Sequence, residues 1–445
     1  MRKNDEIILD IVDVTSEGSG VGRYEGMAVF VPHTAVGDTV CVKILKVQKS
    51  YAYGKAQKLI SASNTRCNAD CAVYEKCGGC VFRHINYEEE KRIKTEIVRN
   101  ALLRIGGIDV PMGPIMFDNP DGYRNKAQYP INEEGRAGFF AARSHRIVPV
   151  DCCRLQPPVF SDIQKAFELF IKQYGISIYN EQTGKGLIRH LYIRSSAGGD
   201  VLVTVVINGE KLPHAEPFIE ILKTILGDKL SGVCINVNRQ KTNVILGDTC
   251  RTLYGKGYIV DTICGVKLRV SPLSFAQVNH DMAEKLYSAA IDAACVEGKT
   301  VIDLYCGTGA IGLIAAARAK SVIGVEIVPQ AVEDAIKNAA ENGIENARFI
   351  CDDAAGAAAR LRDEGVTADV VIVDPPRKGC DSELLSIIAN NFSPERIVYV
   401  SCDPATLARD LKILSTLGYS VRTATPADLF PRTAHVETVA LLEKN

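Results

Sequence analysis

The chain lacks the features of a membrane-bound, secreted or strongly basic protein. No apolar run reaches the roughly 18 residues of a membrane span, so we expect no membrane partner. The start, Met1–Glu6, is polar and leads into a strand-like run, unlike a signal peptide. The formal net charge is −1, which excludes a global basic field. A nucleic acid would therefore have to bind through local patches.

A disulfide framework is also not expected. The 445 residues include 15 cysteines, which suits neither a small secreted scaffold nor an even set of pairs. We expect reduced thiols plus a metal site, in the cytoplasm. The contents of 47% hydrophobic and 24% charged residues are ordinary for a globular protein. At roughly 100–200 residues per domain, the length predicts about two to four domains.

Short strands separated by turns, from Ile7 to Ile60, predict a small β-barrel. Its last part, residues 41–60, has lysines interleaved with Tyr51 and Tyr53 and no acid. A solvated strand face would explain lysines alone, whereas lysines with aromatics fit RNA binding by charge neutralisation and base stacking. The segment resembles the TRAM domain of RNA-modifying enzymes in its runs GVGR, VFVP and GD: Gly20–Arg23, Val29–Pro32 and Gly37–Asp38.

Three cysteines, Cys71, Cys77 and Cys80, follow the spacing C-x5-C-x2-C. Structural zinc usually closes with a second nearby pair of ligands, and none follows here. Iron–sulfur clusters often take one distant cysteine, for which Cys152 and Cys153 are candidates. The residues favour a [4Fe–4S] cluster but leave zinc and metal-free thiols open.

The middle of the chain has the pattern of a mixed α+β domain. A helix is expected from about Tyr87 to Ile105, ended by Gly106–Gly107, and we expect it to pack on the catalytic domain. Residues 187–196 and 201–207 predict a hairpin around residues 198–200. The run Tyr123–Lys126 fits a motif near a substrate cleft and an ordinary surface turn equally well.

From Ser271 the chain alternates strands and helices, which predicts a doubly wound parallel sheet. A glycine loop with Gly307 and Gly309 follows the first strand, where a backbone can approach a ligand closely. Glu326 ends the second strand, where a carboxylate reaches ribose hydroxyls, although a plain exposed acid would also fit. Asp353, after the third strand, is placed to meet an adenine amino group.

Glycine spacing alone does not separate NAD from S-adenosylmethionine as the ligand. The turn Asp374-Pro375-Pro376 at the end of the fourth strand does, because it is typical of methyltransferases and has no use in a dehydrogenase. In many of these enzymes an aromatic residue follows and an exocyclic amine is the acceptor. Here Arg377 follows instead. We therefore predict S-adenosylmethionine as donor and a different acceptor.

A cysteine, Cys402, ends the next strand, in the run SCDP. Uracil C5 is a poor nucleophile until a thiolate adds at C6, so a cysteine here predicts methylation of a pyrimidine C5. Glu437 is the candidate base for the C5 proton, with His435 as a rival. A helix beginning near Pro404 is expected to favour the thiolate. A small buried strand-end residue is the alternative for Cys402.

With these motifs the sequence resembles the bacterial 23S rRNA (uracil-5-)-methyltransferases that carry a TRAM domain and an iron–sulfur cluster. The resemblance implies S-adenosylmethionine contacts, a nucleophile at Cys402 and a base at Glu437. The implied cluster ligands are Cys71, Cys77, Cys80 and Cys153. The implied cofactor contacts are Gln277, Tyr305, Gly307, Gly309, Glu326, Asp353 and Asp374.

The expected architecture has three domains. They are an OB-like TRAM β-barrel over residues 1–60, an α+β iron–sulfur domain over 61–270, and a Rossmann-like class I methyltransferase domain over 271–445. The expected partner is 23S ribosomal RNA, with the target uridine flipped out and with no obligate protein partner. The alternatives are the same chemistry on tRNA, which the TRAM and cysteine segments disfavour, and a non-catalytic RNA-binding or ribosome-assembly protein.

Overall fold

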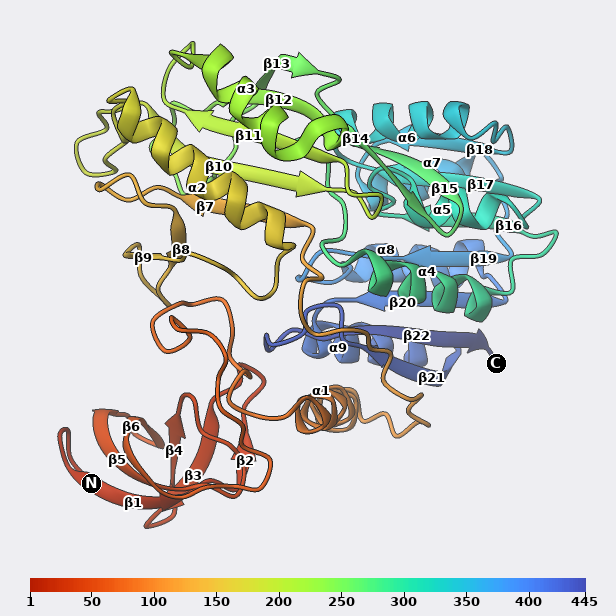
Figure 1. The fold of residues 1–445 in the computed structure, drawn as a ribbon. Coiled ribbons are helices and arrows are strands. Elements are labelled where there is room, and N and C mark those ends of the chain that lie inside the picture. The colour runs from red at the N-terminus through yellow and green to blue at the C-terminus, as the bar shows by residue number, and fades with distance from the viewer. The chain divides into compact units, whose positions relative to one another are not determined.

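The computed structural model describes residues 1–445, which divide into two compact units. The first comprises Met1–Ile97, Phe139–Val148 and Phe430–Val436, and the second Val98–Gly138, Pro149–Leu429 and Glu437–Asn445. Figure 1 shows the ribbon of each. None of the helices combines the length and apolar character that crossing a membrane requires.

A curled six-stranded sheet forms the N-terminal part of the first unit, in the order β1-β5-β6-β4-β3-β2. Its strands are β1 (Glu6–Asp10), β2 (Asp13–Val14), β3 (Gly20–Tyr24), β4 (Met27–Val31), β5 (Thr39–Val47) and β6 (Tyr51–Ser61). Alternate residues point inward, so Leu9, Val29 and Val42 lie in one apolar core. The loop before β5 is held by buried Asp38, which pairs with Arg66 at 2.5 Å. Burial acts to raise the pKa of Asp38, but the bonds from Arg66, Ser63 and Ala35 lower it overall.

The predicted helix near 87–105 is present as α1 (Tyr87–Ala101), which continues into a π-helical turn at Leu102–Gly106. Gly107 ends it with a φ of 68°, a left-handed conformation that glycine adopts without strain. Strands β8 (Gly138–Phe140) and β9 (Ile147–Pro149) form a small separate sheet.

The second unit contains a five-stranded sheet in the order β13-β12-β11-β10-β7. Its strands are β7 (Lys126–Pro130), β10 (Ile188–Ser195), β11 (Val201–Ile207), β12 (Leu230–Val237) and β13 (Thr249–Gly255). The predicted hairpin is β10 with β11, and both strands are buried along their whole length. The helices of this part are α2 (Pro158–Gln173), α3 (Ala215–Leu226) and the 3₁₀ turn Gly227–Lys229. A hairpin of β14 (Ile259–Ile263) and β15 (Val266–Val270) follows.

A seven-stranded sheet completes the second unit, in the order β18-β17-β16-β19-β20-β22-β21. Its strands are β16 (Thr300–Leu304), β17 (Ser321–Glu326), β18 (Ala347–Cys351), β19 (Val370–Val373), β20 (Arg396–Ser401), β21 (Tyr419–Ala427) and β22 (Glu437–Lys444). The first five are parallel, and β22 runs antiparallel to both β20 and β21. The central strand β19 is Val-Val-Ile-Val and fully buried, as expected for a parallel strand covered on both faces.

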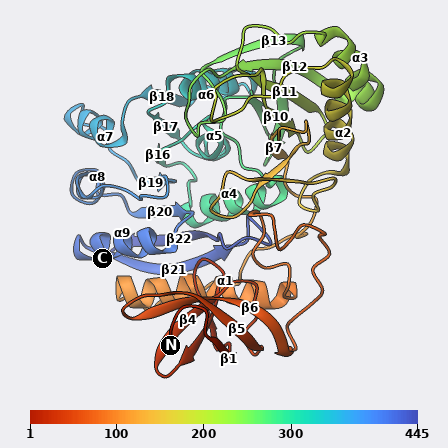
Figure 2. The same ribbon diagram turned by 90° about the vertical axis from the view of Figure 1, so that its left-hand side faces the viewer.

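Six helices cover this sheet: α4 (His280–Ala294), α5 (Ala310–Ala316), α6 (Pro329–Glu341), α7 (Ala354–Asp363), α8 (Ser382–Ile387) and α9 (Pro404–Thr416). A π-helical turn at Ile388–Phe392 extends α8. Helix α4 packs against α5, whereas α7, α8 and α9 pack in succession, as Figure 2 shows. This is the doubly wound sheet that the alternating pattern predicts, and its strand order reverses at β16, where ligands of such sheets usually bind.

Candidate active site

The carboxyl ends of the parallel strands meet at one edge of the seven-stranded sheet, and most of the predicted site residues follow them. Tyr305 follows β16, Glu326 ends β17, Asp353 lies just beyond β18, Asp374 follows β19 and Cys402 follows β20. Because β22 is antiparallel, its first residue, Glu437, lies at this same edge. The sheet thus gathers residues that are far apart in the sequence.

The loop after β16 has the strained backbone of a ligand-binding turn. Tyr305, Gly307 and Gly309 have φ values of 66°, 55° and 84°, and for tyrosine this left-handed conformation is costly. An added Cβ at Gly307 would have no heavy atom within 4 Å, so the space beside it is open. At Gly309 the same Cβ would lie 3.0 Å from the ring of Phe349, which explains that glycine by packing.

Glu326 is tied to this loop. Its Oε2 accepts a hydrogen bond from the backbone N–H of Gly307 at 3.1 Å, and its Oε1 accepts one from Val328 at 2.9 Å. Asp353 is exposed, and its Oδ1 accepts the N–H of Gly356 at 2.9 Å as the N-cap of α7. One carboxylate oxygen of Asp353 is therefore already used to cap α7.

Strand register brings Cys402 beside Glu437. Ser401 pairs with Thr438 in the β20–β22 ladder, so the next residue of one strand faces the previous residue of the other. Burial raises the pKa of Glu437 to about 8, with Asp374 adding to the rise and Arg377 opposing it. Burial alone raises the pKa of Asp374 to about 7. Both carboxyl groups therefore have pKa values well above those of ordinary surface carboxyls.

The start of α9 next to Cys402 is not accompanied by a low pKa of that thiol. Burial raises that pKa to about 11, Glu437 and Asp374 raise it further, and Arg377 opposes them. The side chain of Asp403 accepts the N–H groups of Ala405 and Thr406, so the first turn of α9 is already satisfied by its own cap. Arg377, noted in the sequence only for replacing an aromatic residue, is the cation that favours both ionised groups.

A buried carboxylate, Asp410 of α9, supports the loop that carries Asp374. Its Oδ2 accepts the N–H of Cys380 at 2.8 Å and the hydroxyl of Tyr399 at 2.6 Å, and its Oδ1 accepts Nε of Arg409 at 2.7 Å. Gly379 has a φ of 75°, and a Cβ there would lie 2.4 Å from Asp410 Oδ2. Nothing in the sequence pattern singles Asp410 out, because its partners come from three separate elements.

Gln277 is held from two sides. Its backbone carbonyl accepts Nδ2 of Asn125 at 3.2 Å, and its side chain bonds the hydroxyl of buried Tyr287 on α4. The N–H of Asn125 also bonds the carbonyl of Val278 at 2.9 Å. The run Tyr123–Lys126 is therefore hydrogen-bonded to the loop around Gln277. The interpretation of this run as an ordinary surface turn is wrong.

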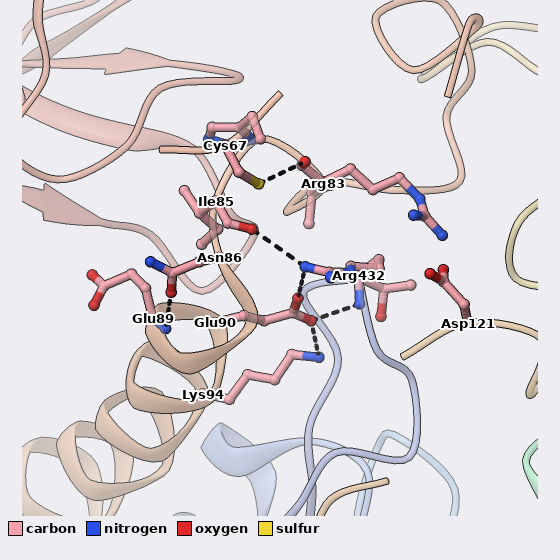
Figure 3. Close-up of polar contacts among 12 residues, drawn as sticks. Cys67, Arg83, Ile85, Asn86, Glu89, Glu90, Lys94, Asp121 and Arg432 are labelled. Atoms are coloured by element: carbon pink, nitrogen blue, oxygen red, sulfur yellow. Dashed lines mark hydrogen bonds and ion pairs between the residues drawn. The ribbon is translucent and has the colours of Figure 1, made fainter. Parts of the chain in front are cut away.

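The loop that precedes Glu437, residues 430–436, is fixed within the first unit by a buried charge network (Figure 3). Glu90 on α1 accepts the backbone N–H of Arg432 at 2.6 Å and pairs with its guanidinium at 3.3 Å. Lys94, one turn further along α1, lies 2.9 Å from Glu90 and donates to the carbonyl of Phe430. The carbonyl of Arg432, a residue with a φ of 69°, accepts N–H groups from Val81 and Phe82. His435 in this loop is exposed, whereas Glu437 is buried, which weakens His435 as the rival base.

Three of the predicted metal ligands, Cys71, Cys77 and Cys80, lie in one loop of the first unit. Burial raises the pKa of Cys80 to about 11, and Cys77 and Cys71 add to the rise, so these three thiols act on one another. Their loop is close-packed, since the N–H of Gly78 bonds the carbonyl of Phe140. No group of three or more His, Cys, Asp or Glu side chains in residues 1–445 is arranged to hold a metal ion, and Cys153 belongs to the other unit. The cluster therefore stays a prediction.

Comparison with known proteins identifies the family. Residues 265–445 match the family described as tRNA (Uracil-5-)-methyltransferase, and residues 3–56 match the TRAM domain. An uncharacterized RNA methyltransferase of Clostridium acetobutylicum is 43% identical over 100% of this chain and 98% of its own length. Another, from Caldanaerobacter subterraneus subsp. tengcongensis, is 44% identical over 98% of this chain and 97% of its own length. The chain belongs to the TRAM-containing RNA (uracil-5-)-methyltransferases.

One solved structure matches this RNA methyltransferase over its whole length. The tRNA (uracil-54, C5)-methyltransferase of Pyrococcus abyssi, in complex with S-adenosyl-L-homocysteine, superposes with a TM-score of 0.80 and 28% identity. The match covers 98% of the present chain and 100% of the other. The sequence-based predictions of a class I methyltransferase fold, of a TRAM domain and of an S-adenosylmethionine-dependent RNA (uracil-5-)-methyltransferase are thereby confirmed.

Proposed function

We propose that this RNA methyltransferase transfers a methyl group from S-adenosylmethionine to C5 of a uridine in 23S ribosomal RNA through a covalent adduct of Cys402. The observation that supports this most is the meeting of Cys402, Glu437 and Asp374 at one sheet edge, with electrostatic coupling among all three. A purely structural cysteine would need neither acid beside it.

In the proposed reaction, the thiolate of Cys402 adds to C6 of uracil, which makes C5 an enolate carbon. That carbon attacks the methyl group of the donor, so that the C5–methyl bond forms while the methyl–sulfur bond breaks and the donor leaves as the neutral thioether. The Glu437 carboxylate then accepts the C5 proton, and the electrons of that C–H bond form the C5–C6 double bond as Cys402 leaves. A pKa of about 8 suits Glu437 to this task, because a base works best when its pKa lies near the operating pH.

The donor would lie along the loop after β16. The open space at Gly307 and the carboxylate of Glu326 beside it fit an adenosyl group, with Gln277, Tyr305, Gly309, Asp353 and Asp374 as the other proposed contacts. When bound, S-adenosylmethionine supplies an electrophilic methyl group on a positively charged sulfur. That positive charge would also stabilise the Cys402 thiolate, whose pKa is high without it.

Ribosomal RNA is the proposed substrate; the TRAM domain and the cysteine-rich loop support binding of RNA but do not separate ribosomal from transfer RNA, because the match to the Pyrococcus tRNA enzyme covers 98% of the chain. On the TRAM sheet the rings of Phe30, Tyr51 and Tyr53 lie together with centroids 5.5–5.8 Å apart. Aromatic groups beside lysines provide a stacking surface for RNA. The second candidate is tRNA, which the Pyrococcus enzyme of similar fold modifies.

We further propose that Cys71, Cys77, Cys80 and Cys153 hold a [4Fe–4S] cluster that shapes the RNA-binding part of the protein. No step of the methyl transfer passes through it. Purified protein would show the iron content and absorption of a cluster, and Cys77→Ser would lose both. An unchanged activity on reduction and oxidation of the cluster is expected, and activity that follows its redox state would contradict a structural role.

The substrate proposal is tested with tritiated S-adenosylmethionine on unmodified ribosomal and transfer RNA. Label in 5-methyluridine of ribosomal RNA supports the proposal, label only in transfer RNA favours the second candidate, and no label in either favours a non-catalytic RNA-binding protein. The mechanism is tested with RNA that contains 5-fluorouracil, whose C5 fluorine cannot leave as a proton. A covalent protein–RNA adduct is expected with donor present and should be absent in Cys402→Ala.

A further inference from the structure

Three cations, Arg124, Lys126 and Arg194, share one face at the edge of the five-stranded sheet. Arg194 on β10 is the direct cross-strand partner of Lys126 on β7. Side chains in such a pair are about 4.5–5.5 Å apart at Cβ. Arg124 lies two positions before Lys126, which puts it on the same side of an extended chain. Like charges directly opposite each other destabilise a sheet, so this arrangement calls for an explanation.

None of the three cations is balanced by an acid. The side chain of Arg194 is only 4% exposed, yet its hydrogen bonds go to neutral groups, the hydroxyl of Tyr192 at 2.5 Å and the carbonyl of Ser274 at 2.5 Å. No ion pair joins any of the three to a carboxylate in residues 1–445, and burial together with Arg194 and Arg124 lowers the pKa of Lys126 to about 8. A buried cation without a counter-charge is costly, and an anionic ligand would remove that cost.

Hydrogen bonds connect the segments that carry this cation cluster (Arg124, Lys126 and Arg194) to the loop around Gln277. Asn125, between two of its members, holds the carbonyl of Gln277, and Arg194 holds Ser274 in the same loop. Gln277 in turn bonds Tyr287, whose pKa is raised by burial and by Asp374 and Glu437. Arg124 and Lys126 are partly exposed, so a large ligand can reach them.

We propose that Arg124, Lys126 and Arg194 bind a backbone phosphodiester of the RNA substrate next to the target uridine. Cations that face phosphates fix the position of the RNA without reading its sequence. The protein has a net charge of −1, so such a local cluster is needed where the RNA enters the site. The proposal rests on the proposed RNA methylation and adds a phosphate subsite to it. A single carboxylate of the methyl donor would be the competing anion.

The test measures binding of unmodified 23S ribosomal RNA and transfer RNA transcripts by Arg124→Gln and Lys126→Gln over a series of salt concentrations. Each variant should weaken binding of the substrate RNA by about tenfold. The steepness with which the logarithm of the association constant falls with the logarithm of the salt concentration should decrease by about 0.7–1, as expected for the loss of one phosphate contact. The loss should fall on RNA affinity and on the KM for RNA more than on the Kd for S-adenosylmethionine, because the two cations are proposed to contact the RNA. Lys211→Gln, which removes an exposed lysine elsewhere in the second unit, is the matched control and should leave the slope unchanged.

Unchanged RNA affinity and salt slope in both variants would overturn the phosphate subsite, as would a loss confined to the donor, which would assign the cluster to the donor carboxylate. Melting temperatures at or above that of the wild type would show that both variants fold, since each relieves like-charge repulsion. Methyl transfer by the wild-type enzyme is measured in parallel. If it modifies neither RNA, the proposed function fails, whereas the binding series still reports on the cation cluster.

Discussion

We predict that the substitution Glu90→Gln strongly destabilises the loop of residues 430–436, because Glu90 is the centre of a buried charge network. In Glu90→Gln the carboxylate that faces both Lys94 and Arg432 is removed, although the shape of the side chain is kept. Glu90 and Lys94 have fully buried side chains, and that of Arg432 is 14% exposed. Removing one partner of such a buried set costs about 3–5 kcal/mol, because the remaining cations stay buried without a counter-charge.

Hydrogen exchange measures this cost at the loop itself. The N–H of Arg432 is bonded to Glu90, and those of Val81 and Phe82 are bonded to the carbonyl of Arg432. At about 1.4 kcal/mol per tenfold change, exchange of these amides should accelerate by roughly 10²–10⁴-fold. The loop leads directly into Glu437 in the chain, so kcat should fall along with the protection.

Glu88→Gln is the matched control for this prediction. Glu88 lies on the same helix and pairs with Lys91. The Lys91 side chain is only 9% exposed, but that of Glu88 is 84% exposed, so water screens the pair, which should contribute about 0–1 kcal/mol. Its exchange rates and kcat should stay near those of the wild type. If the Arg432 amide of Glu90→Gln exchanged as slowly as in the wild type, the conclusion that this charge network fixes the loop would be refuted.

Other variants test the reaction site. Arg377 opposes the raised pKa values of Cys402 and Glu437; because both groups must be deprotonated to act, Arg377→Gln should move the rise of kcat by up to about one pH unit to higher pH. The exposed neighbour Lys378 is the control, since Lys378→Gln should leave the pH profile in place, and an unshifted profile in Arg377→Gln would exclude this role. In Glu437→Gln the methylated adduct should accumulate on natural RNA, visible as a protein–RNA band of reduced mobility, whereas rapid turnover would remove Glu437 as the base. Asp410→Asn should lower the melting temperature and kcat together, since hydrogen bonds to a charged group contribute about 1.5–3 kcal/mol; a change in neither would show that the Asp374 loop holds without it.

Much of the fold follows from local patterns in the chain. The strand that ends at Glu326, the hairpin of β10 and β11 and the glycine loop after β16 lie where the sequence predicts them, the hairpin to within one residue, because side-chain alternation and glycine turns are properties of neighbouring residues. The helix α1 ends in a π-helical turn at Leu102–Gly106, which the periodicity of the sequence does not reveal.

The sequence by itself determined which chemical groups the site contains: a thiol, four acids at strand ends, and a glycine loop. Tertiary structure alone decided which of them interact, since the pairing of Ser401 with Thr438 depends on a ladder between distant strands. The high pKa of Cys402, the support from Asp410 and the pairing of Lys126 with Arg194 have the same origin. Burial and charge proximity are set by long-range contacts, and no local pattern encodes them.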